Sequence, residues 1–141
     1  MNNRFYAMRR SDEWETPQDF FNSLNNEFHF TLDAAASDAN HKVPRYYTIE
    51  DNALARSWAG ETVFLNPPYS QIKEWVKKAY IEHLQPKKTI VLLIPARTDT
   101  KYFHKYIYHR SEIRFIKGRL KFGGKDNAPF PSMLAIFRSA D

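Results

Sequence analysis

An apolar run that ends in two consecutive prolines, at residues 61–70 (ETVFLNPPYS), restricts the fold of this chain more than any other stretch. Residues 62–65 predict a short buried strand, because β-branched and aromatic side chains suit a pleated surface and the run is too short for a helix. Pro67 and Pro68 end the strand, since proline has no N–H and restricts the residue before it. Asn66 and Pro67 are therefore expected to be extended, which fixes the direction of the Pro67 carbonyl.

The residues after this strand place an amide, a fixed backbone carbonyl and an aromatic ring in consecutive positions, from Asn66 to Tyr69. At the carboxyl end of a strand, these groups can form a pocket for a planar group that carries an NH2, such as a nucleobase. A structural alternative stays open, in which the prolines only end the strand, Asn66 caps a turn and Tyr69 belongs to the core.

The order of the other predicted elements indicates an α/β fold, with one sheet that turns antiparallel at one edge. The continuous apolar run at residues 89–94 is typical of a central parallel strand covered on both faces. Further strands are predicted at residues 28–32, 45–49, 112–122 and 133–137, a short helical turn at residues 53–59, and a helix at residues 100–109.

Capping residues predict where two helices begin. Thr16 is a good N-cap, Pro17 suits the first helical position, and Asp19 favours the helix start electrostatically, so a helix is expected from Pro17 to Phe28. Ser70 is expected to cap a second helix, whose apolar residues recur at helical spacing over residues 72–80. An exposed cap could bind a carboxylate or phosphate, although most capped helices bind nothing there.

Polar residues follow several of the predicted strands. Asp33 precedes the small residues 34–37 (AAAS), Asp51 follows residues 45–49, and residues 97–99 (RTD) follow the central strand. In open α/β sheets ligands bind at the carboxyl ends of the strands, so these residues and the NPPY sequence should lie along one edge. A solvated turn carboxylate is the alternative for Asp51.

Composition narrows the class of protein. A chain of 141 residues fits one domain, and without cysteine it has neither disulfides nor thiolate zinc ligands. The net charge of +5 suggests an anionic partner, most commonly nucleic acid. The longest apolar run is too short to cross a membrane, and we expect a soluble, cytoplasmic protein with a mobile basic arm at residues 1–12. The histidines show no zinc-ligand spacing, so no metal site is predicted.

Seven short sequences, in one order and over almost the full length, resemble the small phage-type DNA adenine methyltransferases, the Dam-like amino-methyltransferases. They are WETP (14–17), LDAAAS (32–37), PRYYTIEDNAL (44–54), FLNPPYS (64–70), IPARTDTKYFH (94–104), GRLKFGG (118–124) and APFPSMLAIF (128–137). The resemblance implies a Rossmann-like fold in one domain over residues 13–141, without a separate target-recognition domain. It also implies S-adenosylmethionine as methyl donor, S-adenosylhomocysteine as product, and double-stranded DNA as substrate. Protection of phage or mobile-element DNA from restriction, in the cytoplasm of a bacterial host, would be its biological role.

The resemblance assigns roles to individual residues. Asn66, Pro67, Pro68 and Tyr69 correspond to the catalytic tetrapeptide. Thr16 and Pro17 would lie near the methionine end of the donor, and Asp51 would contact its adenine or its ribose. The residues expected to bind the donor are Trp14, Thr16, Pro17, Asp33, Ala34, Ala35, Ser37, Asp51 and Asn66. The donor loop departs from the usual pattern, since it has alanines where such loops normally have glycines.

The tetrapeptide also suggests a mechanism. If the Asn66 side-chain oxygen and the Pro67 carbonyl each accept one N–H of an adenine amine, its lone pair points toward the donor's methyl group. The base must first leave the duplex, and stacking on Tyr69 would offset part of that cost. Methylation of cytosine, of an RNA base or of a protein glutamine stays open, as does a catalytically silent DNA-binding protein. The expected phosphate contacts, for which a solvated strand face is the alternative, are Arg97, Arg114, Lys117, Arg119, Lys121 and Lys125.

Overall fold

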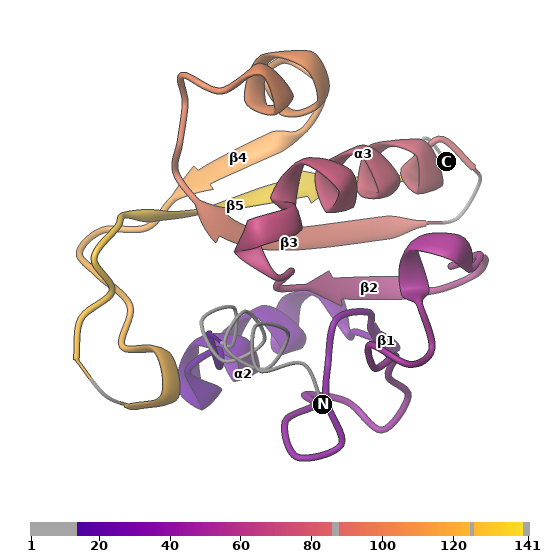
Figure 1. Ribbon diagram of the computed structural model, residues 1–141, viewed down its shortest axis with the longest axis horizontal. Coiled ribbons are helices and arrows are strands. Elements are labelled where there is room, and N and C mark those ends of the chain that lie inside the picture. The colour runs from indigo at the N-terminus through magenta and orange to yellow at the C-terminus, as the bar shows by residue number, and fades with distance from the viewer. Residues whose placement is uncertain (1–13, 86–87, 125, 140–141) are drawn as a thin grey trace, which may run out of the picture.

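A single mixed sheet organises the chain in the computed structural model, which describes residues 14–85, 88–124 and 126–139. Within these residues five strands lie in the order β1-β2-β3-β5-β4 (Figure 1). β1, β2 and β3 are parallel, and β5 is antiparallel to both β3 and β4. The predicted α/β class is therefore confirmed. The strands are β1 (Leu32–Asp33), β2 (Thr62–Leu65), β3 (Thr89–Pro95), β4 (Glu112–Phe115) and β5 (Ser132–Phe137), and the two longest helices are α2 (Gln18–Phe28) and α3 (Ile72–His83).

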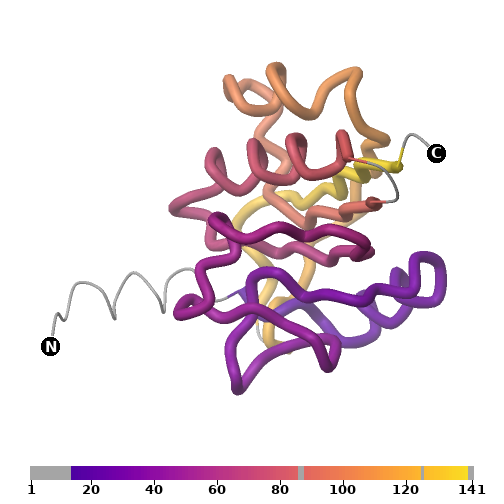
Figure 2. The backbone as a smooth tube through the Cα atoms, turned by 90° about the vertical axis from the view of Figure 1, so that its right-hand side faces the viewer, coloured from indigo at the N-terminus to yellow at the C-terminus, as the bar shows by residue number. Residues whose placement is uncertain are grey.

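Helix α3 covers one face of the sheet and helix α2 covers the other (Figures 1 and 2). Along β3, Ile90 and Leu92 belong to the core on the α3 side, whereas Val91 and Leu93 belong to the core on the α2 side. All four side chains are fully buried. This confirms the prediction that residues 89–94 form a central strand covered on both faces.

Both long helices begin differently from the sequence prediction. α2 starts at Gln18, Pro17 occupies the N-cap position, and the cap makes no side-chain hydrogen bond. Thr16 is 3% exposed, and its hydroxyl accepts a hydrogen bond from Asn66 instead of capping the helix. The prediction of Thr16 as an exposed N-cap is therefore wrong. Ser70 does not cap α3 either, because the helix has Gln71 at its N-cap position and begins after a helical turn at Tyr69–Gln71.

Three predicted strands are shorter than expected. Of the strand predicted at residues 28–32, only Leu32 lies in β1, because α2 continues through Phe28 and ends at His29 in a left-handed conformation (φ 55°). Residues 45–49 make an isolated parallel bridge between Tyr46 and Asp33, at the edge of the sheet next to β1. The strand predicted at residues 112–122 ends at Phe115, and Gly118 with φ 77° turns the chain soon after. The connection from β4 to β5 then passes close to α2 (Figure 1).

The remaining connections contain short helical turns. The turn predicted at residues 53–59 is a 3₁₀ turn at Ala53–Ala55, followed by the fully buried Trp58. The helix predicted at residues 100–109 contains a π-helical turn at Phe103–Ile107. No helix among the described residues is long and apolar enough to span a membrane. The basic arm predicted at residues 1–12 and the expected DNA contact Lys125 lie outside the described residues.

Candidate active site

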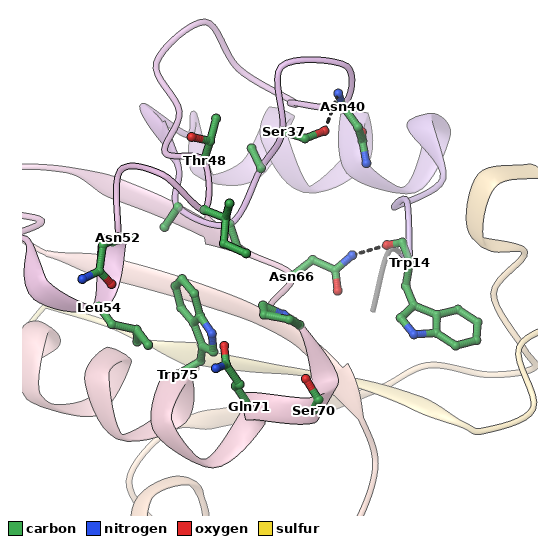
Figure 3. A pocket seen from close by; sticks show the side chains of 16 residues that line it. Trp14, Ser37, Asn40, Thr48, Asn52, Leu54, Asn66, Ser70, Gln71 and Trp75 are labelled. Atoms are coloured by element: carbon green, nitrogen blue, oxygen red, sulfur yellow. Dashed lines mark hydrogen bonds between the residues drawn. The ribbon is translucent and has the colours of Figure 1, made fainter. Parts of the chain in front are cut away.

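A cavity of about 440 Å³ lies at the carboxyl ends of β1 and β2. Figure 3 shows the parts of the chain around it: the segment before α2, the loop after β1, the residues that lead into the Ala53–Ala55 turn, and the stretch from the end of β2 into α3. This is the edge of the sheet at which ligands bind in open α/β folds, and where the sequence predicts the site. The volume is in the range that drug-sized ligands and cofactors occupy. Its lining residues are Trp14, Ala34, Ala35, Ala36, Ser37, Asn40, Thr48, Ile49, Asn52, Ala53, Leu54, Asn66, Pro68, Ser70, Gln71 and Trp75.

Asn66 lies directly after β2, and every polar atom of its side chain has a hydrogen-bond partner. Its Nδ2 donates to the backbone carbonyl of Trp14 (Figure 3) and to the Thr16 hydroxyl at 3.0 Å. Its Oδ1 accepts from the Tyr69 hydroxyl at 3.0 Å. A backbone carbonyl can only accept, so the atom that faces Trp14 must be the amide nitrogen. The contacts therefore fix the orientation of the amide and direct its oxygen toward Tyr69.

The Tyr69 ring is part of an aromatic cluster, which we define as Trp14, Tyr69, Phe122 and Phe130. The Trp14 and Tyr69 rings are stacked, with centroids 6.2 Å apart and planes 16° from parallel. Phe130 meets Tyr69 edge-on at 5.6 Å. Burial, with a smaller contribution from Tyr102, raises the pKa of the Tyr69 hydroxyl well above its ordinary value. Tyr69 is thus a neutral hydrogen-bond donor at physiological pH, and one face of its ring is covered by Trp14.

The two prolines fix the backbone between Asn66 and Tyr69. Pro67 is buried and Pro68 lines the cavity. The Pro68 carbonyl accepts from the Gln71 backbone N–H at 3.1 Å, which starts the turn into α3. Among the described residues no group donates to the Pro67 carbonyl, so this acceptor is available for a ligand.

Asp33 ends β1 and is 4% exposed. Its Oδ2 accepts from the Lys42 backbone N–H at 2.9 Å, whereas its Oδ1 has no hydrogen-bond partner among the described residues. Burial raises the pKa of this carboxyl, and the backbone hydrogen bond from Lys42 offsets only part of that shift. A small cavity of about 20 Å³ borders Asp33, Thr16 and Asn66. A buried acceptor beside such a space is suited to a cationic or hydrogen-bond-donating group.

The alanine-rich loop after β1 forms one wall of the large cavity. The backbone N–H of Ala34 donates to Phe64 at 3.2 Å, and that of Ala36 donates to Tyr47 at 2.9 Å. The Ser37 hydroxyl accepts from the Asn40 backbone N–H at 3.0 Å (Figure 3). The small side chains let a ligand approach the backbone of this loop closely.

Asp51 holds Thr48, a residue that lines the large cavity. Its Oδ2 accepts from the Thr48 backbone N–H at 2.8 Å and from the Thr48 hydroxyl at 3.2 Å. The backbone hydrogen bond is the main reason that the pKa of Asp51 lies below its ordinary value. Asp51 does not itself line the cavity in the described structure, while Thr48 and Asn52 do. Pro17, at the start of α2, likewise lines neither of the two described cavities.

Among the lining residues that were not expected from the sequence to belong to the site are Asn40, Thr48, Asn52, Gln71 and Trp75. The sequence predicts that Trp75 is a core residue, because it lies on the apolar face of α3. Its exposed fraction of 7% agrees with that prediction. The other four are polar residues in loops or at a helix end. Their only signal in the sequence is that they follow predicted strands closely.

The basic residues expected to contact DNA have different environments. Arg114 makes two hydrogen bonds to Glu27, at 2.7 and 2.8 Å, and one to Glu112 at 2.6 Å. Arg119 donates to the Ala128 carbonyl at 3.2 Å. The side chains of Arg97, Lys117 and Lys121 are exposed. Arg114 is therefore engaged within the protein. Arg97, Lys117 and Lys121 form no ion pair with the described residues, and the two lysines lie close in sequence to Phe122 of the aromatic cluster.

Comparison with known proteins shows the family to which this chain belongs. A family model described as DNA N-6-adenine-methyltransferase (Dam) matches residues 6–139. A DNA N-6-adenine-methyltransferase of Escherichia phage T1 is 37% identical over 111 residues, which cover 77% of this chain and 46% of the phage protein. One of Haemophilus phage HP1 is 32% identical over 135 residues, which cover 89% of this chain and 78% of that protein. The chain thus spans less than half of the T1 protein and about three quarters of the HP1 protein. With nearly all of its residues matched by the family model, the chain belongs to the DNA N-6-adenine-methyltransferase (Dam) family.

Proposed function

We propose that this chain transfers a methyl group from S-adenosylmethionine to the exocyclic amine of adenine in DNA. Its family and the names of its two phage relatives support the reaction. The observation that carries the proposal is the fixed Asn66 amide, whose oxygen is an oriented acceptor. The adjacent Pro67 carbonyl accepts no hydrogen bond from any described residue. Two acceptors in consecutive positions are what an aromatic NH2 group requires.

The large cavity fits the methyl donor. S-adenosylmethionine supplies a methyl group on a positively charged sulfur, and it also carries an ammonium, a carboxylate, a ribose and an adenine. The buried Asp33 Oδ1, which has no partner within the described protein, is suited to a cationic or hydroxyl group of that molecule. The polar side chains of Thr48 and Asn52 line the part of the cavity next to Asp51. We assign these two residues, of which Thr48 is held by Asp51, to the nucleoside end of the donor.

Asn66 and Pro67 would activate the amine by accepting its two N–H groups. The amine of adenine is a poor nucleophile, because its lone pair is delocalised into the ring. Acceptors for both hydrogens favour tetrahedral nitrogen and direct the lone pair to one side. The contribution of the protein is orientation and electrostatic stabilisation, because both acceptors are held by the fold before the base arrives.

Entry of the base requires a rearrangement of the aromatic cluster. Tyr69 is the stacking surface that we assign to the extruded adenine, but Trp14 stacks on it in the structure. The Tyr69 hydroxyl also occupies the Asn66 Oδ1 that the amine would use. Extrusion of a base costs a few kcal/mol, and stacking returns about 1–3 kcal/mol per base. The adenine would therefore replace the stacking of Trp14 on Tyr69 and the hydrogen bond from the Tyr69 hydroxyl to Asn66.

The DNA backbone would lie along the connection between β4 and β5. This connection contributes Phe122 and Phe130 to the aromatic cluster, and the Gly123 N–H donates to the Glu15 carbonyl at 2.8 Å. These contacts keep Lys117 and Lys121 near the base-binding side of the site. We propose double-stranded DNA as the substrate, and protection of that DNA from restriction as its biological consequence. A Rossmann-like arrangement of the sheet, with the donor at the carboxyl ends of β1 and β2, completes the proposal.

The experiment that tests this function uses labelled donor, genomic DNA from an unmethylated host, and nucleoside analysis of the product. We expect N6-methyladenine as the labelled nucleoside. The variant Asn66→Ala should bind the donor in calorimetry but lose methyl transfer, whereas Asn22→Ala, a matched change on the exposed face of α2, should retain both. Label in cytosine or in protein, no label with the wild-type protein, or near-normal turnover by Asn66→Ala would each contradict the proposal.

A further inference from the structure

We infer that Thr16 is a positioning residue for methyl transfer, which acts by holding the Asn66 amide in its active orientation. The inference rests on the proposed function and deepens it. The resemblance to known methyltransferases places Thr16 at the donor. The structure instead shows its hydroxyl in contact with Asn66, at 3.0 Å from Nδ2. The two residues are 50 positions apart in the sequence and meet only because the segment before α2 crosses the end of β2.

An asparagine in this position needs to be held against rotation. The two ends of an amide have nearly the same size, so a half-turn exchanges its oxygen and its NH2 group. The turned amide would present N–H groups to the adenine amine, which needs an acceptor. The orientation of Asn66 thus decides whether the site can bind the substrate amine productively.

The Trp14 carbonyl opposes that rotation, and the Thr16 hydroxyl adds a second hydrogen bond to the orientation that the carbonyl sets. The Trp14 carbonyl accepts one N–H of Asn66 and the Thr16 hydroxyl accepts the other. If the amide turned, its oxygen would face the Trp14 carbonyl, and two acceptors would be in contact without a hydrogen between them. Thr16 is only 3% exposed, so water cannot easily replace its hydroxyl as a partner of Asn66.

The segment that carries these acceptors is itself held in place. The Glu15 carbonyl accepts from the Gly123 N–H at 2.8 Å, and the Pro17 carbonyl accepts from the Phe21 N–H at 3.0 Å. Thr16 lies between these two anchor points. Its hydroxyl therefore has a fixed position relative to Asn66, which a positioning residue requires.

The pair Thr16→Val and Thr16→Ser tests the inference. Valine keeps the branched shape but has no acceptor, and serine keeps the hydroxyl. We expect Thr16→Val to lower kcat by about 2- to 13-fold, the factor that corresponds to one neutral hydrogen bond. Its dissociation constant for S-adenosylmethionine should stay within about two-fold of wild type, measured by calorimetry, and Thr16→Ser should restore most of kcat.

A spectroscopic measurement follows the Asn66 amide directly and does not depend on turnover. In NMR spectra, the side-chain NH2 signals of Asn66, assigned with Asn66→Ala, should shift and exchange faster with solvent in Thr16→Val, and return in Thr16→Ser. Unchanged NH2 signals, or unchanged kcat together with weaker donor binding, would overturn the inference. If the wild-type protein shows no methyl transfer at all, the proposed function fails, while the NMR comparison still decides whether Thr16 holds Asn66.

Discussion

Replacing Trp14 by alanine should strengthen the binding of an extrahelical adenine, although it removes a large aromatic side chain. In the structure Trp14 stacks on the ring of Tyr69, with the planes 16° from parallel. A base in contact with both rings needs about 7 Å between them, because each contact takes about 3.5 Å. The centroids are only 6.2 Å apart, so Trp14 must move before the adenine can stack on the covered face of Tyr69.

The size of the effect follows from the contact that the base displaces. A stacked aromatic pair contributes about 0.5–1.5 kcal/mol beyond its buried area, so removing the competition from Trp14 should tighten binding by about 2- to 13-fold. Trp14 also meets Phe122 at 5.6 Å and Phe130 at 5.1 Å, both edge-on. These contacts stabilise the folded protein but do not cover Tyr69. The variant should therefore be less stable and yet bind the substrate more tightly.

Fluorescence anisotropy with a short duplex can measure this effect. The duplex carries the sequence found by sequencing modified DNA, with the target adenine mispaired so that its extrusion costs little. Phe122→Ala is the matched control, since it removes packing from Trp14 but leaves Trp14 over Tyr69, and it should not improve binding. Weaker binding by Trp14→Ala, with the protein folded by circular dichroism, would refute the reasoning and make Trp14 a wall of the base pocket.

Three further predictions concern charge and protonation. Tyr69→Phe keeps the ring and removes only a hydrogen bond to the Asn66 oxygen that the adenine amine would replace, so kcat should change by less than about tenfold. A decrease of about 10²–10⁴-fold, typical of general acid–base catalysis, would give that hydroxyl a chemical role. Burial raises the pKa of Asp33 above 3.8, so the folded state binds a proton on this carboxyl more tightly than the unfolded state does. The free energy of unfolding of the wild type, relative to that of Asp33→Asn, should therefore fall as the pH rises from about 4 through the raised pKa. Urea unfolding across that range measures it, and a stability difference that does not change with pH would contradict it. The double variant Lys117→Gln with Lys121→Gln should reduce the steepness of log K for DNA binding against log salt concentration by about 0.9 for each phosphate that the protein no longer neutralises. Arg114→Gln should change that slope little, because the charge of Arg114 is paired with two glutamates. Equal slopes for the wild type and both variants would remove Lys117 and Lys121 from the DNA surface.

The local pattern of the sequence predicted the parts of the fold that local forces determine. The run at residues 62–65 formed β2, and the continuous apolar run at residues 89–94 formed the central strand β3. Strand ends were less predictable, because they depend on tertiary partners. Phe28 has strand propensity, but it is the last residue of α2, since its ring packs against Phe30 and the core on that side of the sheet.

The contacts of the site were hidden from the sequence for the same reason. Thr16 has the chemistry of an N-cap, and nothing near it in the sequence indicates that its hydroxyl would contact Asn66. Tyr69 was expected to offer a free ring, and only the fold shows Trp14 on it. By contrast, the loop after β1 could be placed at the cavity from sequence alone, because its small residues directly follow a strand.

Asn66 is where the donor side and the base side of the site meet. Its nitrogen faces the segment before α2 and the small cavity beside Asp33, while its oxygen faces Tyr69 and the aromatic cluster. The small cavity beside Asp33 thus borders both Asn66 and Thr16, one of the residues that hold its amide. The Asn66 oxygen already accepts a hydrogen bond from the Tyr69 hydroxyl, and an adenine amine that takes the place of this hydroxyl exchanges one neutral hydrogen bond for another. Such an exchange contributes little net affinity, because one hydrogen bond replaces another of similar strength. The value of this acceptor then lies in the orientation that it imposes on the amine, and affinity for the base must come mainly from stacking and from phosphate contacts.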